Sequence, residues 1–258
     1  MHSTILAHLA FVLVYFSCGW WLSVKTDKFA WIDVFWVSSF VPIIVYSLFS
    51  VETWPQVILH LMYLAWSCRL SILLITRVYG KAEDSRYVKL RNYWGHIASL
   101  YFYLLFLTEG ALVLVLLIPI YLVSQSSQIE LDAWNLFAAT SFIIFLLGES
   151  LADWQRNRFA KLHWGQKKVC RYGLWKYSRH PNYFFEILIW YTFALFNLGL
   201  NQNLLSFLPA IVMHILIWKV TGVPPSRQQS LESRGEAYRQ YMKSTNELIP
   251  WPPKEKLT

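Results

Sequence analysis

The fold class is set by the stretch Ile97–Val123, which reads IASLYFYLLFLTEGALVLVLLIPIYLV. This stretch holds no lysine or arginine, and its one acidic residue is Glu109. A helix needs about 20 mostly apolar residues to cross the hydrocarbon core of a bilayer. The stretch is long enough for that, so it predicts a membrane-spanning helix.

Six further stretches have the same character, and together they predict an all-α, polytopic membrane protein with seven transmembrane helices. They are Ile5–Val24, Val34–Val51, Gln56–Thr76, Trp134–Ala152, Tyr183–Leu200 and Leu204–Val220. Apolar residues make up 56% of the 258 residues and charged residues 15%, whereas soluble domains carry about 25% charged residues. We expect a single integral-membrane domain over residues 1–258, in contact with membrane lipids.

The basic residues fall on one side of this predicted topology. Seven spans place 22 of the 23 lysines and arginines on the side that holds the C-terminus, and Arg69 lies within a span. The positive-inside rule then puts the N-terminus outside and the C-terminus in the cytosol. The predicted cytosolic parts are the loops 77–96 and 153–182 and the tail 221–258. This bias accounts for the net charge of +8 without nucleic acid as a partner.

The tail predicts one short amphipathic helix. Leu231, Tyr238 and Tyr241 recur at near-helical spacing. Prolines stand on both sides of it, with Pro224-Pro225 before the helix and Pro250 after it.

Several site classes are absent from the sequence. No two glycines form GxG, so there is no Rossmann-type phosphate loop, and no HExxH or GxSxG occurs. The seven histidines form no close pair, and Cys18, Cys68 and Cys170 form no CxxC. We therefore expect no metal site.

Ionisable residues inside the spans cost about 2.5–3.5 kcal/mol each on insertion scales, so they need a reason. Most of them fall in the predicted cytosolic half or at its span ends: Arg69, Glu149, Glu186, Asp33 and Asp153. We favour a ligand site open to the cytosol for this group. The alternative is a set of ion pairs that only fix helix packing, such as Arg69 with Glu186 or with Glu149. Glu109, near mid-membrane, is assigned to structure.

Two motifs flank the largest basic loop: GESLADWQRNRFAK over Gly148–Lys161 and GLWKYSRHPNYFFE over Gly173–Glu186. Pro181 suits the first turn of a helix. The positive end of that helix would face the cytosol beside Arg179 and His180, which favours phosphate.

The same motifs supply a second kind of contact. Asn182 and Glu186 are four residues apart, so they share a helix face where an amide and a carboxylate could hold a carboxamide or an adenine edge. Tyr177 and Tyr183 offer flat rings for stacking. The alternative is a belt of interfacial aromatic residues and basic side chains that reach toward water.

The motif YSRHPNYFFE resembles the signature of the DUF1295 membrane proteins, which are related to the C-terminal domain of steroid 5-alpha-reductases. The resemblance extends over most of the chain. It includes IDVFW (32–36), EDSRY (83–87), ADWQ (152–155), TGVP (221–224), RGEAYRQYMKST (234–245) and LIPWPP (248–253).

This resemblance implies a seven-helix fold that holds NADPH in its cytosolic half and takes a lipophilic substrate from the bilayer. With the motif residues, the predicted cofactor-binding set is Arg69, Arg77, Asp153, Arg156, Arg158, Tyr177, Ser178, Arg179, His180, Asn182, Tyr183, Glu186, Arg234, Tyr238 and Tyr241.

The sequence departs from the family pattern at two places. Phe185 stands where the resemblance leads us to expect glycine, so its ring would narrow the pocket or face lipid. The reductases also use a Glu and a Tyr to polarise the substrate ketone, and Trp36 and Trp66 occupy those places here. Asp33 and Tyr63, one turn away, are the predicted catalytic substitutes.

Three functions stay open. The first is an NADPH-dependent reductase of a carbon–carbon double bond in a steroid-like or polyprenyl enone. The second is a membrane methyltransferase of the isoprenylcysteine type, which shares an RHPxY element and uses S-adenosylmethionine. The third is a non-catalytic lipid-binding protein of the same fold. A dinucleotide demands several basic groups, which this chain has. A bacterial inner membrane and the endoplasmic reticulum fit equally well.

Overall fold

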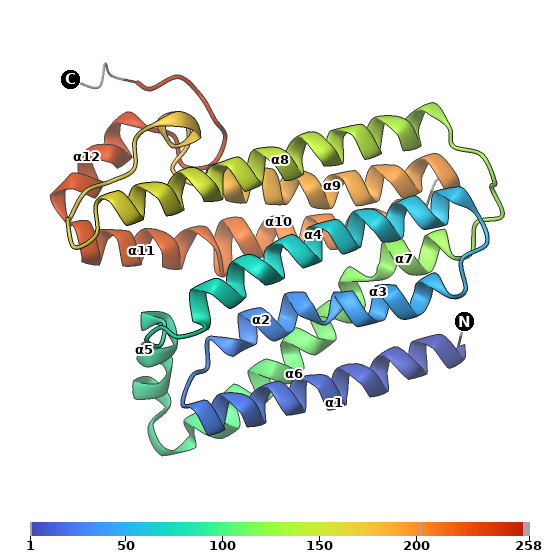
Figure 1. Cartoon of the computed structure of the whole chain (residues 1–258), viewed down its shortest axis with the longest axis horizontal. Helices are drawn as coiled ribbons and strands as arrows, with labels where there is room; N and C mark the ends of the chain where they lie inside the picture. The colour runs from blue at the N-terminus through green and yellow to red at the C-terminus, as the bar shows by residue number, and fades with distance from the viewer. Residues whose placement is uncertain (1, 202, 255–258) are drawn as a thin grey trace. The chain divides into compact units, whose positions relative to one another are not determined.

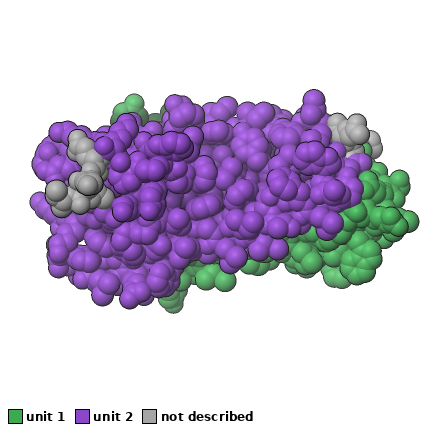
Figure 2. Space-filling model, turned by 90° about the horizontal axis from the view of Figure 1, so that it is seen from above, with its two compact units in different colours: residues 1–131 green, residues 132–258 purple. Residues whose placement is uncertain are grey.

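The computed structural model describes residues 2–201 and 203–254. It divides into two compact units, residues 1–131 and 132–258, which Figure 2 shows in different colours. The last four residues of the predicted tail, 255–258, lie outside the described residues.

In the described part of the first unit, all regular secondary structure is helical (Figure 1). Its helices are α1 (His2–Thr26), α2 (Trp31–Ser38), α3 (Phe40–Leu48), α4 (Trp54–Val78), α5 (Ser85–Trp94), the 3₁₀ turn η1 (Gly95–Ile97), α6 (Ala98–Leu116) and α7 (Ile118–Val123). Large aromatic side chains fill its core. Phe29 stacks on Phe102 with ring centroids 3.7 Å apart, and Trp66 meets Phe40 edge to face at 5.2 Å.

The second unit is built on the long antiparallel pair α8 and α9 (Figure 1). Its elements are α8 (Ala133–Leu162), the turn η2 (Gly173–Lys176), α9 (Pro181–Asn201), η3 (Leu204–Ser206), α10 (Phe207–Ile215), the π-helical turn η4 (Leu216–Val220), α11 (Val223–Arg234) and α12 (Glu236–Ser244). A capping box starts α8, because the Asp132 carboxylate accepts from the Asn135 backbone N–H at 2.7 Å.

The prediction of seven long apolar helices is confirmed, since seven helical segments of the described chain are long and apolar enough to cross a bilayer. Two predicted spans are bent. The second divides into α2 and α3 at Ser39, and the fourth into α6 and α7 at Leu117. Pro42 and Pro119 lie in the first turns after these breaks, and each lacks the N–H that a continuous helix would use. The orientation of the termini stays a prediction.

The helix α8 continues to Leu162, so the predicted cytosolic loop 153–182 begins as helix. The prediction of one helix in the tail was wrong, because the tail holds two. Gly235, at φ +54°, separates α11 from α12, and this left-handed conformation suits glycine because it has no Cβ. Pro224 and Pro225 lie inside the first turn of α11 and do not precede it.

Candidate functional site

The loop before α9 and the end of the chain are joined by backbone hydrogen bonds in the second unit. Arg179 N–H donates to the Asn246 carbonyl at 2.9 Å, and Trp251 N–H donates to the Tyr177 carbonyl at 3.0 Å. The Ser178 hydroxyl donates to the Leu248 carbonyl at 2.7 Å and accepts from His180 N–H at 3.1 Å. Ser178, a predicted cofactor contact, therefore uses its side chain to join the tail to the start of α9.

The helix α12 is locked onto the same loop by Tyr241. Its hydroxyl lies 3.0 Å from the Ser178 carbonyl oxygen and also contacts the Trp175 carbonyl. Burial raises the pKa of Tyr241, so the phenol stays protonated and donates. The Arg171 guanidinium lies over the Tyr241 ring and donates to the Ala237 carbonyl at 3.0 Å.

Five arginines gather around this junction, where α11, α12 and the loop after α8 come together in Figure 1. We call them the arginine cluster: Arg156, Arg171, Arg179, Arg227 and Arg234. Three of them act together on His180. Burial, and then the positive charges of Arg179, Arg156 and Arg227, lower the pKa of His180 to about 3. His180 is therefore neutral at physiological pH.

Several buried polar atoms at the cluster have no hydrogen-bond partner among the described residues. They are Nε and Nη1 of Arg179, Nε2 of His180, Oδ1 of Asn182 and the hydroxyl of Tyr238. All four side chains are less than 9% exposed. Folded proteins satisfy at least about 90% of their buried polar groups. Five such atoms in one place therefore indicate a site for a polar, anionic ligand.

The carboxylates beside the cluster already have neighbours. Asn182 donates through Nδ2 to Asp153 Oδ1 at 3.4 Å, so α8 and α9 bring these two predicted residues together. Glu186, one turn further along α9, is buried and accepts from Trp190 Nε1 at 2.9 Å.

Other predicted contacts lie at the margin of the cluster. Arg158 is exposed and lies over the Trp154 ring, so it is on a different face of α8 from Asp153. Tyr183 stacks nearly parallel on His180, with ring centroids 5.5 Å apart. Tyr177 is 40% exposed.

Phe185 fills a space that Gly148 leaves open on α8. A Cβ on Gly148 would lie 2.7 Å from the Phe185 ring. The Phe185 ring therefore packs between the two helices, and the two readings offered from the sequence, a narrowed pocket or contact with lipid, stay predictions.

The predicted residues of the first unit have partners of their own. Tyr63 is fully buried, and its hydroxyl donates to the Leu116 carbonyl at 3.0 Å. Trp36 and Trp66 meet edge to face at 6.0 Å. Arg69 and Arg77 both lie on α4, eight residues apart, and Arg77 acts electrostatically on Asp84.

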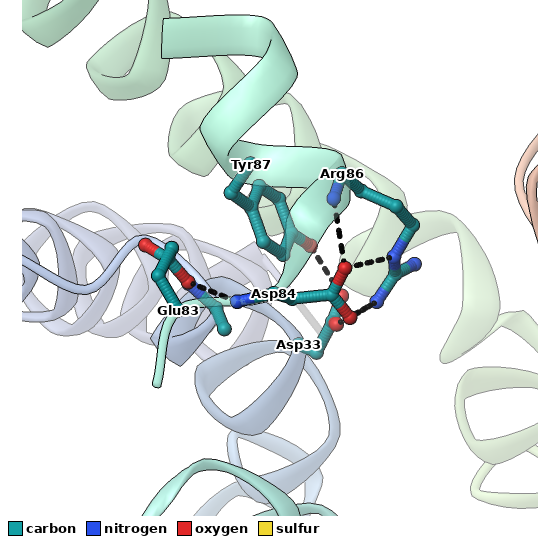
Figure 3. Close-up of polar contacts among 6 residues, drawn as sticks. Asp33, Glu83, Asp84, Arg86 and Tyr87 are labelled. Carbon is teal, nitrogen blue, oxygen red and sulfur yellow. Dashed lines mark hydrogen bonds and ion pairs between the residues drawn. The ribbon is translucent and has the colours of Figure 1, made fainter. Parts of the chain in front are cut away.

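Asp33 belongs to a dense polar network that we call the EDSRY hub: Asp33, Glu83, Asp84, Arg86 and Tyr87. Asp33 accepts from the Tyr87 hydroxyl at 2.7 Å and from Arg86 Nη2 at 3.0 Å. Figure 3 shows the Arg86 guanidinium facing the carboxylates of Asp33 and Asp84. The hub thus joins the start of α2 to the start of α5.

The acids of the EDSRY hub also hold the neighbouring backbone. Glu83 accepts from the N–H groups of Phe29 and Ala30, just before α2 begins. Asp84 caps α5 by accepting from Arg86 N–H at 2.9 Å. Burial alone would raise the pKa of Asp84, but the hydrogen bonds and charge of Arg86 leave it below its ordinary value.

Sequence reasoning missed three residues at the arginine cluster: Arg171, Arg227 and Glu247. Arg227 follows Pro224-Pro225 in the first turns of α11, and its place beside two helix-starting prolines was the available signal. Glu247 is an acid between the tail motifs 234–245 and 248–253, and its Oε1 lies 3.4 Å from Arg179 Nη2.

Comparison with known proteins covers nearly the whole chain. Residues 19–245 match the family described as protein of unknown function (DUF1295). The chain is 27% identical over 216 residues to an uncharacterized protein of Schizosaccharomyces pombe, and the match covers 72% of this chain and 62% of that protein. No solved structure matches the chain. The chain belongs to the DUF1295 family.

Proposed function

We propose that the protein is a membrane-embedded reductase that uses NADPH to reduce a carbon–carbon double bond in a lipophilic, steroid-like or polyprenyl enone. The observation that carries this proposal is the set of unpaired buried atoms on Arg179, His180, Asn182 and Tyr238. The resemblance to the steroid 5-alpha-reductase C-terminal domain supplies the reaction class.

The residues at the arginine cluster fit the groups of a phosphorylated dinucleotide. Arginine binds phosphate through parallel N–H donors, and Arg179 has two nitrogens, Nε and Nη1, without a partner among the described residues. The phenol of Tyr238 is a further donor, and burial raises its pKa, so it stays protonated. Asn182 Oδ1 is an unused acceptor that suits an amide or amino group.

Bound NADPH would supply the hydride that the reduction consumes. The protein's own part is to hold the cofactor and to exclude water. His180 serves as a neutral N–H donor or acceptor beside the arginines, because its pKa of about 3 keeps it uncharged. Asp153, within reach of the Asn182 amide, fixes that side chain so that Oδ1 faces away from Asp153.

For polarisation of the substrate carbonyl, Asp33 and Tyr63 stay the predicted residues. A donor is needed where negative charge develops on the carbonyl oxygen. Both oxygens of Asp33 already accept, from Tyr87 and Arg86. The Tyr63 hydroxyl gives its one proton to Leu116, so a change in one torsion would redirect it. Tyr63 therefore needs the smaller rearrangement.

The test is a binding comparison on the purified full-length protein in lipid nanodiscs, with NADPH, NADH and S-adenosylmethionine. NADPH should bind more tightly than NADH by about ten- to a hundredfold, because one charge-assisted contact to the extra phosphate is worth roughly 1.5–3 kcal/mol. Calorimetry and the shift in melting temperature report both affinities.

The outcomes separate the three functions. Equal affinities for NADPH and NADH would contradict the role given to the arginine cluster. Binding of S-adenosylmethionine alone would favour the methyltransferase. A protein that binds none of the three would be assigned to the lipid-binding alternative.

A further inference from the structure

The residue that stands out at the arginine cluster is an acid, Glu247. Its Oε1 lies 3.4 Å from Arg179 Nη2 and 3.2 Å from Arg227 Nη1, so one carboxylate oxygen serves two guanidinium groups. Both contacts join Glu247 to members of the cluster. Two positive groups therefore share one negative one.

The contacts of Glu247 are long and use one oxygen. Tight guanidinium–carboxylate pairs are bidentate, with N···O distances of about 2.7–2.9 Å. Here Arg179 keeps Nε and Nη1 unpaired although a carboxylate is beside it. Glu247 thus neutralises part of the charge of Arg179 and meets Nη2, but it leaves Nε and Nη1 unsatisfied, and a better anion could use them.

The backbone, and not the carboxylate, holds Glu247 in place. Its neighbours Asn246 and Leu248 are fixed through their carbonyls by Arg179 N–H and the Ser178 hydroxyl. Ser178 and Asn246 form an isolated parallel β-bridge. The Glu247 side chain is 29% exposed, compared with 9% for Arg179. It therefore stands at the outer side of the buried donors and is free to turn toward water.

We propose that Glu247 is an internal competitor for the anion site, which a ligand's phosphate group must displace from Arg179 and Arg227. Such a residue sets specificity by charge. A singly charged carboxylate gains little by replacing another carboxylate, whereas a diphosphate brings more charge and more acceptor oxygens to the same donors. Displacement also frees Glu247 to move into solvent, so the ligand leaves no buried unpaired acid behind.

This inference rests on the proposed function only for the identity of the ligand, because it needs an anionic group at Arg179 and nothing more. The test therefore uses two probes on the full-length protein in nanodiscs, inorganic pyrophosphate and NADPH. In Glu247→Gln the shape is kept and the negative charge is lost. Both probes should bind roughly three- to tenfold more tightly, as expected for the loss of two partly exposed charge pairs.

The matched control is Glu236→Gln. Glu236 lies in the same tail and pairs with Arg239 at 3.4 Å, with both side chains more than 60% exposed. The control changes the net charge equally and should leave both affinities unchanged. If Glu247→Gln does not fold, Glu247→Asp replaces it, since the shorter side chain withdraws the carboxylate and should tighten pyrophosphate binding by a smaller factor.

The direction of the change decides the inference. Weaker or unchanged pyrophosphate binding in Glu247→Gln would overturn it and make Glu247 a positioning residue for the two arginines. The inference is also overturned if neither probe binds the wild type or the variant. If pyrophosphate tightens and NADPH does not bind, the internal competitor stands and the proposed cofactor fails.

Discussion

The EDSRY hub and the arginine cluster are both dense groups of charged residues, but their hydrogen bonding differs. In the hub, Asp33, Glu83 and Asp84 all accept hydrogen bonds from Arg86, Tyr87 or the backbone. At the cluster, the Glu247 carboxylate meets two guanidinium groups through a single oxygen, and five buried polar atoms lack a partner among the described residues.

This difference in hydrogen bonding distinguishes residues that stabilise the fold from residues that are available to bind a ligand. An unsatisfied buried polar group costs about 1–3 kcal/mol, so a protein that keeps several together gives up stability at that place. The hub does the opposite and joins α2, α5 and the chain between α1 and α2. We therefore propose that the hub contributes mainly to folding and the cluster to ligand binding, so mutations at the two should affect different measurements.

The largest expected effect is on ligand affinity at the cluster. Arg179→Met keeps the length of the side chain and removes its charge and donors. NADPH and pyrophosphate affinity should fall at least about a hundredfold, because a bidentate, charge-assisted contact is lost. The melting temperature without ligand should stay the same or rise, since the unpaired Nε and Nη1 disappear.

Arg158→Met is the matched control for that change. It removes one positive charge from an exposed side chain that lies over Trp154, and affinity should change by less than about threefold. A lowered melting temperature with unchanged affinity in Arg179→Met would assign Arg179 to structure and erase the contrast with the hub.

The second effect is on stability at the hub. Arg86→Met leaves the facing oxygens of Asp33 and Asp84 without their partner. Breaking a fully buried pair costs about 3–5 kcal/mol. Because these side chains are 28–38% exposed, we expect a smaller loss of about 2–3 kcal/mol in the free energy of unfolding.

Denaturant titration of the purified protein measures that loss, and Lys81→Met in the same loop serves as the control. Lys81 is exposed, so its replacement should leave the free energy of unfolding within about 0.5 kcal/mol of wild type. An Arg86→Met protein as stable as the control would mean that the hub does not hold the first unit together.

Much of the fold was predictable from hydropathy, because a membrane span is long and apolar whatever it packs against. The seven spans follow from that alone. The bends did not, since Pro42 and Pro119 break helices that hydropathy reads as continuous. The separation of α11 from α12 depends on the backbone conformation of Gly235, which composition does not reveal.

The candidate site was only partly predictable. Arg86 lies in the motif EDSRY and Arg179 in the motif YSRHPNYFFE. The sequence alone does not distinguish an arginine whose donors are paired from one with unused donors. That difference depends on which acids the fold brings near. Asp33 lies 53 residues from Arg86 along the chain, and Glu247 lies 68 residues from Arg179. Only the folded structure brings each pair together.

The smallest expected effect is a pH dependence of the free energy of unfolding. It comes from one proton on His180 at the cluster and has no counterpart in the hub. His180 has a pKa of about 3 in the folded protein and about 6.5 when unfolded. Between these values the unfolded chain binds a proton that the folded one does not. The stabilisation is therefore complete above pH 6.5 and is lost as the pH falls toward 3.

Between pH 7 and pH 6, this difference predicts a loss of about 0.7 kcal/mol in the free energy of unfolding. His180→Gln should lose less than wild type over the same interval, whereas Asp84→Asn in the hub should lose as much. The reason for the contrast is that the pKa of Asp84 lies below its ordinary acidic value, so this residue takes up no proton near pH 6 in either state.

Saturating pyrophosphate should also reduce the wild-type loss, because an anion beside His180 favours its charged form and raises its pKa. The free energy of unfolding could instead depend on pH equally in wild type and His180→Gln. That result would mean that His180 is solvated and that the arginine cluster is not buried, and it would remove the contrast with the hub.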